Sequence, residues 1–116
     1  MIPELTNLIK TVCTASVWSD YVPESETGPA ISIINLANGG SDRDIAGTIA
    51  GNKTHWRLTV VSKSTTEVIN IVKQLKKLDN AKTDVFQKVF VEYVLLEPKQ
   101  PGQPYRRAFV DIKLYE

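Results

Sequence analysis

A single stretch of the sequence, residues 54–78, changes from the period of a strand to the period of a helix with almost no loop between them. Apolar side chains alternate with other residues from Trp56 to Val60, which is the two-residue repeat of a pleated strand. Ser64 and Glu67 then have capping-box spacing, in which the Ser hydroxyl accepts an amide of the first helical turn and the Glu reaches back to the cap. Large apolar residues follow at helical spacing, namely Val68, Ile71, Val72, Leu75 and Leu78. The stretch therefore predicts a sheet with an amphipathic helix packed across it.

The other expected elements follow from the same two periods. They are a helix at about 3–16, strands at 30–36 and 54–62, a helix at about 64–79, and strands at 88–97 and 106–115. Apolar residues on both faces of 88–97 favour a central or doubly covered strand. The order α-β-β-α-β-β predicts one α+β domain, residues 1–116, with two helices on one face of a four-stranded, mostly antiparallel sheet. If the strands that flank the second helix are neighbours, they are parallel and the sheet is mixed.

The expected connections are polar and rich in turn-forming residues. Residues 38–53 carry four glycines and few large apolar groups, and loops longer than about 12–15 residues are usually functional or disordered. We therefore expect a long loop there that is mobile in the isolated protein and becomes ordered on assembly. Residues 17–23 read as an ordered connection packed on the sheet edge. Three prolines in residues 98–104 prevent the preceding strand from continuing.

Composition limits the classes of protein to which the chain can belong. Fourteen basic and thirteen acidic residues give a net charge of +1, whereas dedicated nucleic-acid binders usually carry a strong basic patch. No apolar run approaches the roughly 20 residues that cross a bilayer. The first residues lack a basic leader followed by an apolar core, so we expect no signal peptide and a cytoplasmic location. Cys13 is the single cysteine, which excludes an internal disulfide.

Residues that carry chemistry are few and scattered. Cys13 falls on the apolar side of the first helix, which is typical of a buried structural thiol. His55 is the single histidine, and no nucleophile motif lies near it. Residues 47–54 resemble a phosphate-binding loop, but Asn52 replaces the second required glycine and a strand follows where that motif needs a helix. We therefore expect no catalytic residues, no cofactor and no metal.

The whole pattern resembles a known family. An amphipathic helix precedes a connection with Trp18, Tyr21 and Pro23, and a short strand, AISIINL, leads into the glycine-rich segment. A strand then runs directly into a helix, HWRLTVVSKSTTEVINIVKQL, and the chain closes with two strands, the last being RRAFVDIKLY. In element order and hydrophobic pattern, this resembles the small tail terminator, or tail completion, proteins of long-tailed bacteriophages.

The resemblance implies a structural protein that performs no chemistry. Its subunits would form a homo-oligomeric ring, a hexamer in that family, on the end of the tail tube. The ring would stop tube polymerisation and present a surface to the head–tail connector or neck protein. DNA would pass through its channel without sequence-specific binding, and the protein would reside at the tail–neck region of the virion after assembly in the host cytoplasm. No membrane is involved.

Seven residues are candidates for contacts in such a ring or its channel. The loops 38–53 and 98–105 supply some of them, because loops on a rigid sheet reach partners that the scaffold does not. Phe109 and Tyr115 face away from the core side of the last strand, so they either rest under a helix or lie in an interface. The full set is Arg43, Lys53, Lys99, Arg106, Arg107, Phe109 and Tyr115.

Two other functions stay open at this point. One is another phage neck or head-completion protein, which shares a similar build. The other is a small α+β domain that binds a metabolite or acts as a minor enzyme, which the scarcity of convergent polar residues disfavours.

Overall fold

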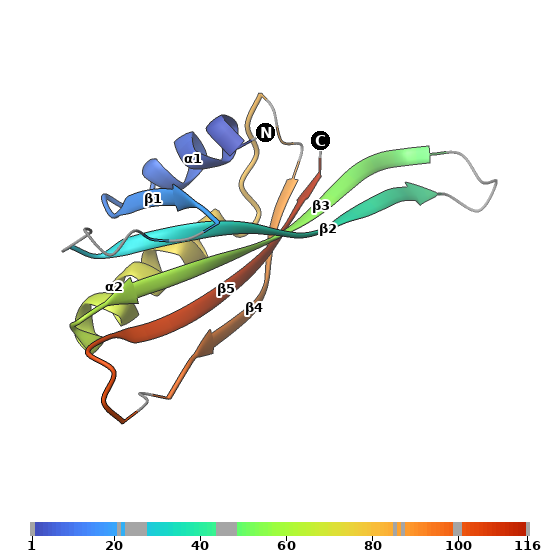
Figure 1. Cartoon of the computed structure of the whole chain (residues 1–116). Helices are drawn as coiled ribbons and strands as arrows, with labels where there is room; N and C mark the ends of the chain where they lie inside the picture. The colour runs from blue at the N-terminus through green and yellow to red at the C-terminus, as the bar shows by residue number, and fades with distance from the viewer. Residues whose placement is uncertain are drawn as a thin grey trace.

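The computed structural model describes residues 2–20, 22, 28–43, 49–84, 86, 88–98 and 101–115, and their side chains apart from those of 2, 37–43 and 49–53 (Figure 1). The elements are α1 (Ile2–Lys10), β1 (Ser16–Ser19), β2 (Ala30–Arg43), β3 (Ile49–Ser62), α2 (Thr65–Leu75), the 3-10 turn η1 (Lys76–Leu78), β4 (Lys88–Leu96) and β5 (Arg106–Tyr115). The fold is α+β, with a five-stranded mixed sheet and two α-helices among the described residues.

The strand order in the sheet is β1-β2-β3-β5-β4, with β1 parallel to β2 and all other neighbours antiparallel. The expectation of four strands was wrong, because β1 lies in the segment that we expected to be a connection. With four residues, SVWS, it is too short to show a period. The strands that flank α2 are parallel but not neighbours, because β5 lies between β3 and β4. The mixed character of the sheet comes from β1.

Both helices pack on one face of the sheet and form one hydrophobic core with it. Strand alternation places Leu58, Val110 and their same-face neighbours towards the helices. From the helices, the buried members are Leu5, Leu8, Ile9, Val68, Ile71, Val72 and Leu75. No helix of the described residues lies on the opposite face of the sheet, which is called the open face below.

The second helix begins where it was expected, whereas the first helix is much shorter than expected. Ser64 caps α2 and accepts the amide of Glu67 at 3.3 Å, as the capping box predicts. The carboxylate of Glu67 instead accepts the hydroxyl of Ser62 at 3.2 Å, and that same hydroxyl accepts the amide of Ser64. Helix α1 ends at Lys10 and does not continue to about residue 16. Directly after it, the hydroxyl and the amide of Thr11 both donate to the carbonyl of Leu8.

A β-bulge at Glu92 changes which side chains of β4 face the core. Pairing with β5 runs Val91↔Ile112 and then Tyr93↔Asp111, so Glu92 is an extra residue. Before and after the bulge, the helix side takes Val89, Val91, Val94 and Leu96. The open face takes Phe90, Tyr93 and Leu95, which are 36%, 51% and 40% exposed. The expectation of a central or doubly covered strand was therefore wrong, since β4 is an edge strand with one open side.

Strands β2 and β3 extend well beyond the rest of the sheet as a two-stranded arm (Figure 1). Their pairing continues to Arg43↔Ile49, whereas β5 accompanies β3 only as far as Lys53. The molecule measures 54 × 26 × 22 Å. The segment 38–53 is thus mostly strand and not the expected loop, although its residues 44–48 lie outside the described part of the chain. The sequence pattern did not predict this strand pair, because glycines and polar residues stand where a strand usually has alternating apolar residues.

Candidate functional site

The open face gathers aromatic and charged side chains from β3, β4 and β5. Cross-strand pairing places Arg57 opposite Asp111, which is itself opposite Tyr93. Two residues along each strand, Thr59, Phe109 and Leu95 form the next row on the same face. Because side chains on one face of neighbouring strands lie about 5 Å apart, these two rows form a continuous surface.

A cation and a ring form the centre of this surface. The guanidinium of Arg57 donates to both carboxylate oxygens of Asp111, at 2.8 and 3.0 Å, and lies 5.1 Å from the ring centre of Phe109. Arg107 reaches the same ring at 5.9 Å. The hydrogen bonds to Asp111 raise the pKa of Arg57 above its usual value. The result is a fixed arrangement of planar groups, of the kind enriched in protein interfaces.

A second cluster lies at the start of β4 and the end of β5. Phe90 and Tyr115 contact edge to face, with ring centres 5.7 Å apart, and the ammonium of Lys88 lies 5.7 Å from the ring of Phe90. Lys113 forms an ion pair with the bulge residue Glu92 at 2.8 Å. Arg57, Arg107 and Lys113 are each paired with an acidic group, so the open face is amphipathic rather than strongly basic.

The structure brings together part of the set predicted from the sequence. Arg107, Phe109 and Tyr115 all lie on the open face, so Phe109 and Tyr115 do not rest under a helix. Alternation along β5 places Arg106 on the other side, where its Nε donates to the carbonyl of Glu97 at 2.9 Å. Lys99 and the side chains of Arg43 and Lys53 lie outside the described part of the structure.

Sequence reasoning missed Arg57, Tyr93 and Asp111. Arg57 and Asp111 were visible as out-of-phase polar residues in alternating strands, but their pairing requires the β3–β5 register. Strict alternation from Val89 and Val91 would place Tyr93 on their side of the strand, and the bulge that reverses this placement leaves no mark in the sequence.

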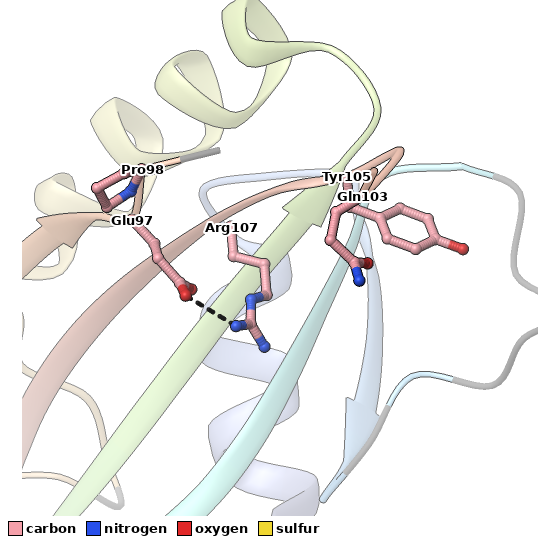
Figure 2. Close-up of a pocket in the computed structure, with 5 residues that line it drawn as sticks. All are labelled: Glu97, Pro98, Gln103, Tyr105 and Arg107. Carbon is pink, nitrogen blue, oxygen red and sulfur yellow. Dashed lines mark hydrogen bonds and ion pairs between the residues drawn. The ribbon is translucent and has the colours of Figure 1, made fainter. Parts of the chain in front are cut away.

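A shallow hollow of about 230 Å³ lies beside the β4–β5 connection, lined by Glu97, Pro98, Gln103, Tyr105 and Arg107 (Figure 2). Arg107 crosses it and forms an ion pair with Glu97 at 2.9 Å. The second carboxylate oxygen, Oε2, is buried and has no hydrogen-bond partner among the described residues. The hollow is polar, and its lining contains no nucleophile with an adjacent base.

The remaining chemically notable residues lie apart from one another. Cys13 is buried, as expected, and burial raises the pKa of its thiol. His55 is partly buried in β3, opposite Lys113 of β5. No three His, Cys, Asp or Glu side chains of the described residues are grouped so as to hold a metal ion. No helix in the described part of the chain is long and apolar enough to cross a membrane.

The fold has counterparts among solved structures, although no family model and no curated protein matches the sequence. A chain described as "Virion of native gene transfer agent (GTA) particle" is similar with a TM-score of 0.54 at 13% identity, over 96% of this chain and 82% of that one. A second solved chain has a TM-score of 0.51 at 12% identity, over 96% of this chain and 95% of that one. At these identities, the similarity describes the fold.

Proposed function

We propose that this protein is a structural component of a phage-like virion and acts as a tail terminator. Its subunits form a ring, a hexamer by analogy with the family that the sequence resembles, on the end of the tail tube. The ring ends tube polymerisation and offers its other side to the head–tail connector. It performs no chemistry, and DNA passes through its channel without sequence-specific contacts.

The observation that carries this proposal is the similarity of almost the whole chain to a chain of a gene transfer agent virion. The element order and hydrophobic pattern support the narrower role of terminator. The projecting β2–β3 arm and the amphipathic open face are surfaces through which one subunit can meet others. Exposed apolar side chains gathered on one face, such as Phe90, Tyr93 and Leu95, are typical of interaction sites.

Deletion of the gene from a phage that carries it tests the role directly. We expect filled heads and unjoined tail tubes of abnormal length in electron micrographs, because nothing stops tube growth. Purified protein added to tubes that are polymerising in vitro should halt their elongation. Joined, normal-length tails without the gene would reject the role of terminator.

The alternative neck or head-completion role predicts a different micrograph. In that case the deletion would leave tails of normal length that fail to join heads, and the purified protein would not affect tube elongation. The two measurements together separate the two assembly roles.

A further inference from the structure

The outer edge of β4 is covered by the chain itself along only part of its length. Along the first half of β4, residues 79–81 occupy the edge: Asn80 donates to the carbonyl of Val89, and the amide of Val89 donates to Ala81. The carboxylate of Asp79 accepts the amide of Val91 at 3.0 Å. The chain itself therefore blocks strand addition over the first half of β4.

The second half of β4, residues 93–96, keeps an exposed edge. The amide of Glu97 donates to the carbonyl of Arg107, which makes 97↔107 a hydrogen-bonded pair of the antiparallel ladder. By alternation, Tyr93 and Leu95 also bond to β5, and the amides and carbonyls of Val94 and Leu96 point away from it. No described residue forms a backbone hydrogen bond to these outward groups.

At the other end of the sheet, β1 presents an edge of matching length. Ser16 donates to the carbonyl of Pro29 and Asp20 to that of Ile33, so residues 16, 18 and 20 bond to β2. In a parallel pair, the intervening Val17 and Ser19 direct both backbone groups outward. The edge of β1 thus offers two outward residues separated by one, as residues 93–96 do.

We infer that the exposed edge of β4 in one subunit pairs antiparallel with β1 of a second copy, with Val17 opposite Leu96 and Ser19 opposite Val94. Strand directions support this arrangement: β1 and β4 run in opposite directions within the subunit, so a sheet that continues from one copy to the next makes them antiparallel. This register joins all four outward amides to outward carbonyls.

The side chains agree with this register. Val17, Val94 and Leu96 all lie on the helix side and pack against the core, so the pairing keeps the helix layer continuous. On the open side, Trp18 comes opposite Leu95, and these two large apolar side chains are 37% and 40% exposed in the single subunit. A non-hydrogen-bonded pair brings side chains closest together, so each of the two covers the other.

Two different surfaces of each subunit meet in this contact, so it is heterologous and repeats around a ring if the rotation closes. The biological role of such a ring rests on the proposed function, but the contact between subunits can be tested independently of that function. If the subunits pair in this way but the protein has no effect on tail length, the contact is upheld and the role of terminator is rejected.

A disulfide between copies tests the register. In a Cys13→Ser background, Trp18→Cys combined with Leu95→Cys should form cross-linked dimers and longer ladders on oxidation. The matched control combines Trp18→Cys with Tyr93→Cys, another exposed position on the same face of β4. It should cross-link at least about tenfold more slowly, because a shift of two residues moves the thiols roughly 7 Å along the strand, beyond disulfide reach. Equal or faster cross-linking of the control, or none by either pair at the highest soluble concentration, would overturn the inference.

A second variant tests the backbone bonds. Val94→Pro removes an amide that faces away from β5, a change that an edge strand tolerates. It should abolish the 18–95 cross-link, whereas Val94→Ala, which loses similar packing and keeps the amide, should retain it. Circular dichroism and thermal unfolding establish that both variants are folded. An undiminished cross-link in folded Val94→Pro would contradict the pairing.

Discussion

At the residue scale, the best-defined interaction on the open face is the ion pair of Arg57 with Asp111. Two hydrogen bonds at 2.8 and 3.0 Å fix the guanidinium above Phe109. The pKa of Arg57 is raised, so the stability that this cation contributes is complete below its unfolded pKa and is lost only as the pH rises through the higher folded value. The arginine therefore adds no pH dependence near neutrality.

Substitution of Asp111 measures this interaction. Asp111→Asn should lower the free energy of unfolding by about 0.5–1 kcal/mol, the range for partly exposed ion pairs. Glu92→Gln, which removes the single-contact pair with Lys113, should have a smaller effect. Urea denaturation of the purified variants measures both. A larger effect for Glu92→Gln would show that the two-bond geometry adds nothing.

Cys13 provides a prediction on pH. Burial raises the pKa of its thiol above 9.0, so the folded state favours the neutral form. Stability from this thiol is complete below the unfolded pKa and falls as the pH rises from about 9 towards the folded value. Between pH 8 and 10, the free energy of unfolding should fall more steeply with pH in the wild type than in Cys13→Ala. Parallel falls in the two proteins would show that the thiol ionises equally in both states.

At the scale of elements, the sequence revealed those whose period is long and uninterrupted. Strand β5 has the predicted bounds, β2 begins at the predicted residue 30, and α2 begins directly after its predicted cap, Ser64. The bulge at Glu92, the four-residue β1 and the glycine-rich arm were not predictable, because tertiary pairing and not local period maintains them. For the site, alternation alone indicated that Phe109 and Tyr115 face away from the core. The partners of these residues depended on the register.

Deletion of Glu92 tests the structural role of the bulge. Without the extra residue, strict alternation would turn Phe90 towards the core and Val89 and Val91 towards the open face. We expect a loss of roughly 3 kcal/mol or more in the free energy of unfolding, since buried side chains become exposed and a ring is forced into a packed core. Glu92→Gln, which keeps the bulge, is the matched control. A deletion variant as stable as this control would mean that β4 can re-pair at little cost.

At the scale of the whole molecule, the chain combines a packed body with surfaces that extend beyond it. The core lies between the helices and one face of the sheet, whereas the open face, the edges at β1 and β4, and the arm lie outside it. A subunit built in this way folds on its own core and keeps several separate surfaces for neighbours. Head-to-tail pairing at the sheet edges would leave the arm and the open face for the tube, the connector or the channel.

The arm is the part of the sheet with the fewest strand partners in the single chain. Beyond Lys53, the pairs Ser41↔Asn52, Asp42↔Gly51 and Arg43↔Ile49 have no third strand beside them among the described residues, because β5 ends at Tyr115, opposite Lys53. An isolated two-stranded hairpin is marginally stable in water. In the free protein, the amides of 41–43 and 49–52 should therefore exchange with solvent at least about 100-fold faster than those of 56–60, and assembly should slow them.

Hydrogen exchange on free and assembled protein measures this difference. The matched variant replaces residues 39–53 with an Asn-Gly turn between the paired residues Asn38 and Thr54, which shortens the hairpin without removing any residue of the described core. It should keep the unfolding temperature of the body within a few degrees and lose the ability to cap tail tubes. Equal, strong protection of the arm in the free protein would show that it carries its own stability. Capping by the shortened variant would show that the arm is a spacer and that the sheet edges and open face supply the contacts.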